Sequence, residues 1–254
     1  MYLGDEMKII AILSICFVLL QPAAHAAPKK DRAYYEGRGD VVWEIPTSEK
    51  KIALTFDDGP DPADTPLILD LLKQYNAKAT FFVIGNKVEK YPDIARREVL
   101  EGHEIANHTY SHKYFRKNIP SETIQKEILD AENAIIQATS VKPRLFRPPG
   151  GFYNENVIHV SKNAGNLVIM WSWHQDTEDW QTPGIYKIVN KVSKNTRNGD
   201  IILFHDYVEG KTQTIAALKQ ILPLLKERGY EFVTVSELLT YRNSTSVDNT
   251  NPIK

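Results

Sequence analysis

Short apolar runs alternate with longer amphipathic segments over most of the chain. The apolar runs are rich in β-branched and aromatic residues, as strands buried on both faces are; they cover 51–56, 79–83, 103–106, 144–147, 167–171, 200–204 and 231–235. The longer segments repeat apolar residues at helical spacing and predict helices at 65–74, 92–101, 121–138, 185–196 and 212–228. This alternation predicts an α/β fold with about seven parallel strands. Periodicity alone allows either a barrel or an open sheet.

The composition is that of an ordinary globular protein. Of the 254 residues, 42% are hydrophobic and 25% are charged, which fits one domain with a sizeable core. We expect that domain to span 48–240. A polar leader at 27–47, expected to cross the surface, and a polar tail at 241–254 flank it.

The first 26 residues have the order of a secretory signal peptide. Lys8 precedes the apolar run 9–20, and Ala24 and Ala26 supply the small residues of a cleavage site after Ala26. The alternative is an uncleaved membrane anchor, which the run disfavours because it is shorter than the ~20 residues that span a bilayer. We therefore expect a secreted or cell-wall-associated protein without stable membrane association.

The net charge suggests neither a nucleic-acid partner nor an acidic one. Residues 1–26 contain one basic and two acidic residues, so the processed chain keeps 30 of each, and it loses Cys16, the single cysteine. A neutral balance does not favour a nucleic-acid partner. We expect a monomer without disulfides or a cysteine metal site.

Polar clusters follow the predicted strands. Because the carboxyl ends of parallel strands meet at one rim of a barrel or one edge of a sheet, these clusters are expected to form one site. They lie at 57–60, 107–112, 147–151, 176–180 and 205–206.

Two of these clusters carry the residue types of a metal site. Asp57 and Asp58 are adjacent at the end of an apolar strand, where buried charge requires a cation or hydrogen bonds. His108 and His112 are four residues apart, and imidazole with carboxylate suits zinc and similar divalent ions. Two histidines with one aspartate leave positions for water and substrate, as in a catalytic site. The pattern favours zinc and also admits cobalt or another divalent ion.

Five motifs occur in an order that resembles the polysaccharide deacetylase family, carbohydrate esterase family four. They are Thr55-Phe56-Asp57-Asp58-Gly59-Pro60, His108-Thr109-Tyr110-Ser111-His112, Arg147-Pro148-Pro149-Gly150-Gly151, Asp176-Thr177-Glu178-Asp179-Trp180 and Leu203-Phe204-His205. The resemblance covers about 51–239. It implies a distorted (β/α) barrel.

The resemblance also implies a role for each of these side chains. Asp58, His108 and His112 are the expected metal ligands, and Asp57 is the expected general base. An unligated carboxylate beside a metal-bound water can take its proton, since the metal lowers the pKa of that water toward ~7. The metal and a backbone N–H from the loop after Arg147 would stabilise the oxyanion.

Arg147 and His205 complete the implied apparatus. Arg147 would pair with Asp57 and hold its pKa down. His205 would protonate the departing amine, kept charged by Asp179, with Asp176 as the less favoured partner. Asp206 receives no catalytic role. The other histidines after the signal region, expected to be structural or exposed, are His103, His159 and His174.

The implied substrate groove departs from the family pattern at one position. The family usually has an aromatic residue where this chain has Gly150, so the side-chain wall there is missing unless Phe152 or Tyr153 replaces it. Trp180 would line the groove, although a core position is the alternative. The expected groove residues are Pro149, Gly150, Gly151, Trp180 and Leu203.

These expectations describe a metal-dependent enzyme that removes N-acetyl groups from N-acetylglucosamine-containing polysaccharide. Peptidoglycan is favoured as substrate and chitin-type oligomers remain open. Two alternatives are an O-acetyl esterase on xylan-type polysaccharide and a catalytically silent glycan-binding protein.

Overall fold

The computed structural model describes residues 30–210 and 212–242. The expected signal peptide lies outside the described residues, as does most of the polar tail. Within the described residues, no helix combines the length and apolar character needed to cross a membrane.

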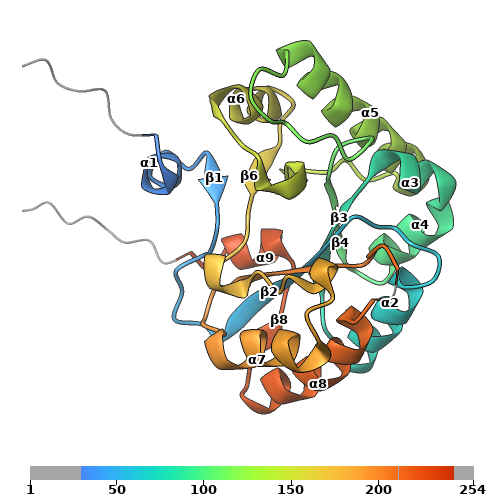
Figure 1. Cartoon of the computed structure of the whole chain (residues 1–254), viewed down its shortest axis with the longest axis vertical. Coiled ribbons are helices and arrows are strands. Elements are labelled where there is room, and N and C mark those ends of the chain that lie inside the picture. Colours follow the sequence, from blue (N-terminus) through green and yellow to red (C-terminus); the bar gives the residue numbers. More distant parts are fainter. Residues whose placement is uncertain (1–29, 211, 243–254) are drawn as a thin grey trace, which may run out of the picture.

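Every strand pair in the described chain is parallel, and the sheet curls into a half-barrel lined by helices (Figure 1). The strand order is β1-β6-β5-β4-β3-β2-β7, with β8 paired to the start of β2. A bridge between Asp176 and Leu203 lays the segment after β6 beside β7. The fold predicted as a distorted (β/α) barrel is thereby confirmed. The strands are β1 Val41–Val42, β2 Lys51–Asp57, β3 Ala79–Val83, β4 Glu104–Asn107, β5 Leu145–Phe146, β6 Leu167–Ile169, β7 Ile201–His205 and β8 Glu231–Phe232.

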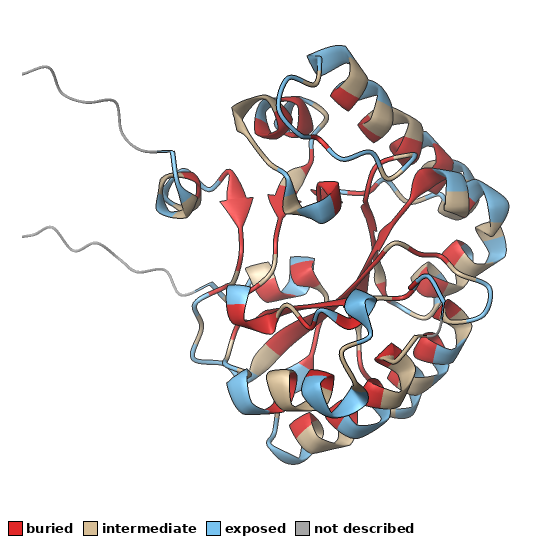
Figure 2. Cartoon of the chain, viewed as in Figure 1, coloured by how far each residue is buried: buried red, intermediate tan, exposed pale blue. Residues whose placement is uncertain are grey.

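The helices turn their apolar faces to the sheet and their polar faces to solvent (Figure 2). Local signals set several helix ends: Pro66 occupies the first turn of α2, and the Asn154 side chain caps α6 by accepting a hydrogen bond from Val157 N. The helices are α1 Arg32–Gly37, α2 Thr65–Gln74, α3 Gly85–Lys90, α4 Pro92–Leu100, α5 Ser121–Thr139, α6 Glu155–Asn163, α7 Ile185–Asn195, α8 Thr214–Glu227 and α9 Val235–Leu239.

A row of phenylalanines fixes the middle of the sheet. Phe56 on β2 stacks between Phe81 on β3 and Phe204 on β7, with ring centroids 5.1 and 5.7 Å away. All three side chains are fully buried, and burying each contributes about 1.5–3 kcal/mol. Asp57 follows Phe56 directly, so the packing of Phe56 in the core fixes the position of Asp57 at the end of β2.

The stretch expected to be a polar leader belongs in part to the barrel. Val41 and Val42 form β1, which pairs with Val168 and Ile169 of β6, and Tyr35 of α1 is buried. The expectation of a surface leader was wrong here because a two-residue strand and a helix of under two turns are too short to show periodicity. For the same reason the sequence did not predict α3 or α9.

Candidate active site

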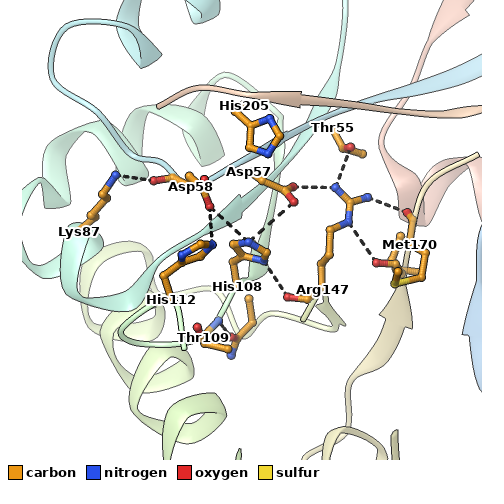
Figure 3. Close-up of polar contacts among 12 residues, drawn as sticks. Thr55, Asp57, Asp58, Lys87, His108, Thr109, His112, Arg147, Met170 and His205 are labelled. Atoms are coloured by element: carbon orange, nitrogen blue, oxygen red, sulfur yellow. Dashed lines mark hydrogen bonds and ion pairs between the residues drawn. The ribbon is translucent and has the colours of Figure 1, made fainter. Parts of the chain in front are cut away.

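The carboxylate of Asp57 is held by a fully buried arginine. Asp57 is the last residue of β2, and its Oδ1 accepts a hydrogen bond of 2.6 Å from Arg147 Nη1 (Figure 3). The guanidinium also donates to Thr55 Oγ1 at 2.9 Å, to the carbonyl of Ile169 at 3.1 Å and to that of Met170 at 2.8 Å. Burial lowers the pKa of Arg147 and Asp57 opposes that change. Four acceptors therefore fix this cation beside Asp57.

Asp58, His108 and His112 converge beside Asp57 (Figure 3). Asp58 Oδ1 lies 3.1 Å from His112 Nε2 and 3.4 Å from His108 Nε2. Within the described chain this oxygen is buried without a hydrogen-bond partner. His108 Nδ1 lies 2.7 Å from the Arg147 carbonyl, which requires the proton on Nδ1 and leaves the Nε2 lone pair facing Asp58. An orphaned carboxylate oxygen with two imidazole nitrogens fits a divalent cation.

The backbone around this group is held in conformations that side chains rarely adopt. The φ angles of Asp58, Thr109 and His112 are 76°, 68° and 57°, and such strain costs of order 1–3 kcal/mol per residue. Hydrogen bonds maintain the histidine loop: the Asn107 side chain accepts from Thr109 N, and the Glu127 carboxylate accepts from the amides of residues 110 and 111. Strain concentrated at three neighbouring positions is typical of a functional site.

His205, at the end of β7, lies opposite Asp57 in the strand register. Its Nδ1 contacts Asp179 Oδ1 at 2.7 Å, and the second oxygen of Asp179 accepts from His205 N and from Thr214 Oγ1. Burial disfavours the imidazolium, but the hydrogen bond and charge of Asp179 outweigh it and raise the pKa of His205 to about 9. With Nδ1 occupied, Nε2 is the nitrogen available to a bound molecule.

Asp176 occupies a different place from Asp179. It bridges to Leu203, its carboxylate accepts a hydrogen bond from Glu178 N, and it lines the cavity described below. Burial raises its pKa. The structure therefore brings Asp179, the favoured partner, to His205.

A cavity of about 380 Å³ opens over these groups. Its polar lining consists of Asp57, Asp58, His108, His112, Asp176 and His205. Its remaining lining consists of Tyr114, Gly150, Phe152, Trp171, Trp180 and Leu203. Trp180 is 56% exposed, so it is a groove residue rather than a core residue. Of the predicted groove residues within the described chain, Pro149 and Gly151 lie outside this lining.

Two aromatic side chains occupy the space over Gly150. A Cβ at this position would lie 2.6 Å from Tyr114 and 3.0 Å from Phe152, and the φ of Gly150 is 64°. The aromatic wall that the sequence pattern lacks at Gly150 therefore comes from other segments. Phe152 was an expected replacement, whereas Tyr114 was not.

Several residues support the site although the sequence gave them no supporting role. Thr55 and Thr214 hold Arg147 and Asp179, and Lys87 Nζ donates to the Asp58 carbonyl at 2.8 Å. Asp206 accepts from Thr65 Oγ1 at 2.6 Å, and burial raises its pKa to about 7. Threonines and lysines are common everywhere, so only the fold reveals what these side chains hold.

A second carboxylate and histidine group lies away from the cavity. Ligand atoms of Glu44, His174 and Asp200 lie within 4.8 Å of one another. Arg32 pairs with Glu44, while Asp200 accepts hydrogen bonds from Arg197 N at 2.8 Å and from the Gln175 side chain at 3.1 Å. These internal partners explain the group as a structural network, in agreement with the expectation for His174.

The curled parallel sheet and the side chains at its rim are those of one class of enzyme. A carboxylate paired with an arginine, a carboxylate and two-histidine group that fits a divalent cation, and a histidine paired with a carboxylate are the residue types of a metallohydrolase site on a βα barrel.

Comparison with known proteins narrows this class to a family. The sequence profile described as polysaccharide deacetylase matches residues 44–169. A peptidoglycan-N-acetylglucosamine deacetylase of Bacillus cereus is 50% identical over 212 residues, covering 84% of this chain and 99% of the relative. The chain belongs to the polysaccharide deacetylase family.

Two further similar proteins are named for other substrates. A chitooligosaccharide deacetylase of a Bradyrhizobium species is 40% identical, covering 79% of this chain and 93% of the relative. The structure of a family four acetyl xylan esterase from Clostridium thermocellum, in complex with a cobalt ion, is 38% identical with a TM-score of 0.69. The match covers 75% of this chain and 90% of the esterase chain.

Proposed function

We propose that this chain is a metal-dependent deacetylase that removes N-acetyl groups from N-acetylglucosamine residues of a polysaccharide, with peptidoglycan as the main substrate. One observation carries the proposal: Asp57 and His205 lie at adjacent strand ends, and both line the cavity with Asp58, His108 and His112. Amide hydrolysis needs a base for the attacking water and an acid for the leaving amine, and these two side chains supply both.

The first chemical step uses Asp57. A divalent cation, once bound by Asp58, His108 and His112, would acidify a water molecule and polarise the acetyl carbonyl. Asp57 accepts the proton as the water oxygen bonds to the carbonyl carbon. Arg147 keeps the carboxylate ionised and oriented for this transfer. The amide of Gly150, in the loop that lines the cavity, is the candidate donor to the developing oxyanion.

The second step uses His205. The C–N bond breaks as the imidazolium gives its Nε2 proton to the nitrogen, so that the sugar leaves as a neutral amine and acetate is released. Asp179 continues to accept the hydrogen bond from His205 Nδ1–H. The proton that Asp57 took from the water then passes to His205, directly or through solvent, and the released acetic acid ionises to acetate, which returns both side chains to their starting forms. Because the pKa of His205 is about 9, the acid is protonated at neutral pH.

The names of the relatives support peptidoglycan first and chitin-type oligomers second. Similarity to an acetyl xylan esterase keeps O-acetyl hydrolysis as the second candidate. A silent glycan-binding role is disfavoured because the chain carries every residue of the proposed apparatus. Export by the signal sequence at 1–26 would bring the enzyme to the cell wall.

Acetate release from three substrates tests this function: peptidoglycan, acetylated chitin oligomers and acetylxylan. Metal content is determined on the same preparation, and zinc is the ion we expect. Preference for xylan would overturn the amide assignment. Full activity after thorough chelation would overturn the role of the metal, and recovery on adding back zinc or cobalt would support it.

A further inference from the structure

In the part of the chain that the structure describes, a basic side chain without an ion-pair partner lies in a hollow beside one end of the cavity. The loop after His112 carries Lys113, Arg116 and Lys117. Within residues 30–210 and 212–242, none of the three lies within ion-pair distance of a carboxylate. The aspartates of the site, by contrast, all face Arg147, histidines or backbone amides. Positive charge therefore remains at this end of the groove.

Arg116 is held in place by aromatic rings. Its guanidinium carbon lies 5.2 Å from the ring centroid of Phe152 and 5.7 Å from that of Tyr114. These two rings contact each other at 5.8 Å, and Tyr114 contacts the ring of His112 at 5.1 Å. A guanidinium resting on aromatic rings keeps its N–H edge free for a planar, bidentate acceptor.

The same rings connect Arg116 to the reaction centre. Tyr114 and Phe152 line the cavity over Asp58, and Phe152 also lines a neighbouring hollow together with Arg116, Lys117 and Tyr153. A glycan lying across Phe152 would thus reach from the cavity to Arg116. A sugar next to the one being deacetylated would meet the cation.

We propose that Arg116 binds a carboxylate carried by the sugar next to the deacetylated residue. This inference rests on the proposed function and sharpens its substrate class to acetylated glycans with acidic substituents, as opposed to neutral ones. The carboxylate accepts from the free N–H edge of the guanidinium. Elsewhere in the cavity an acidic group would meet the carboxylates of Asp57, Asp58 and Asp176, and the proposed function reserves the charged His205 for the leaving nitrogen.

Three tetrasaccharides separate charge from shape. The first alternates N-acetylglucosamine with a sugar bearing a free lactyl carboxylate, the second is its methyl ester, and the third is acetylated chitotetraose. We expect kcat/KM for the acid to exceed that for the ester by about three- to tenfold in 50 mM salt, mostly through KM. The ratio should shrink in 500 mM salt because the pair is exposed.

The variant Arg116→Gln is expected to bring the acid-to-ester ratio to about one, and Arg116→Lys to give an intermediate ratio. Lys219→Gln is the matched control, since Lys219 is exposed on α8; it should leave the ratio and the rates unchanged. An unchanged ratio in Arg116→Gln, or a wild-type ratio of one, would overturn the inference while the proposed function stands. Failure of the wild type on all three substrates would overturn the proposed function and this inference with it.

Discussion

Asp57 and His205 are register partners at the carboxyl ends of the neighbouring parallel strands β2 and β7. Adjacent strands lie about 4.8 Å apart, so one ladder of backbone hydrogen bonds sets the spacing between the proposed base and the proposed acid. Each side chain then has its own buried partner, Arg147 for Asp57 and Asp179 for His205. The two proton-transfer groups are separately oriented on a shared scaffold.

Asp57→Asn should lower kcat by about 10²- to 10⁴-fold, because the amide cannot accept the proton of water. The metal content should stay close to that of the wild type, since Asp58, His108 and His112 are untouched. Activity and bound metal are measured on one preparation. His112→Ala is the matched comparison and should lose both. Full activity in Asp57→Asn would refute the base assignment.

The acid should give kcat a basic limb near pH 9. His205 has a raised pKa of about 9 and is charged below it, so the proton donor is lost as pH rises through that value. Asp179→Asn removes the carboxylate that favours the imidazolium, and the limb should move to lower pH. The pH dependence of kcat measures this. A limb that does not move would show that another group controls it.

Arg147→Lys should reduce both stability and activity. Lysine keeps the positive charge but lacks the planar guanidinium. That group donates hydrogen bonds to Thr55, to Asp57 and to the carbonyls of Ile169 and Met170. Because the charge is kept and the loss is of hydrogen bonds to buried acceptors, urea unfolding should show a loss of about 1–3 kcal/mol. Asp57→Asn leaves the fully buried guanidinium without its counter-charge and should be destabilised more, by about 3–5 kcal/mol. Equal stability of Arg147→Lys and wild type would contradict this account.

Glu98→Gln should stabilise the folded protein relative to wild type, and this stabilisation should increase as pH rises. Glu98 is fully buried on α4, neither of its oxygens has a partner in the described chain, and burial together with the nearby Asp206 raises its pKa well above the usual value. The folded state therefore binds the proton more tightly than the unfolded state. The stability that this proton provides is present at low pH and is lost as pH rises above ~4.3, the unfolded value.

Melting temperatures at pH 5 and pH 8 test the prediction for Glu98. The difference between Glu98→Gln and wild type should grow in favour of the variant at pH 8. Glu122→Gln, at an exposed position on α5, is the control and should show the same difference at both values. A Glu98→Gln difference that does not depend on pH would refute the prediction.

Gly150→Ala should weaken the binding of the glycan in the groove. The added Cβ would meet Tyr114 at 2.6 Å, and the φ of 64° strains any side chain, at a cost of about 1–2 kcal/mol. Displaced aromatic rings should raise KM for the glycan. Gly37→Ala is the control, because nothing lies within 4 Å of a Cβ at Gly37. Similar effects of the two substitutions on KM would argue against the aromatic wall.

The long elements were predictable because their periodicity is strong. The helix at Thr65–Gln74 has the predicted bounds, and β2 and β3 differ from prediction by at most one residue. Short elements such as β1 and α3 carry too few residues for a period to emerge. Their position depends on partners far away in the sequence, as Val41 depends on Val168.

The site was predictable where chemistry is concentrated in motifs. Asp57, Asp58, His108 and His112 meet as the resemblance implies, while their catalytic and ligand roles remain predictions. Tyr114 and Thr214 were not predicted, because an isolated aromatic or hydroxyl residue has no pattern of its own. Their contribution comes from the folding of loops, which a single sequence does not encode visibly.

The fourfold anchoring of Arg147 links the integrity of the barrel interior to turnover. The same cation joins β2 to the residues at and just after the end of β6 and orients Asp57. A molecule whose interior has loosened at β6 therefore also releases Asp57, the proposed base. After heating, the residual activity should therefore be proportional to the fraction of molecules that remain folded. Partly unfolded molecules should contribute no activity.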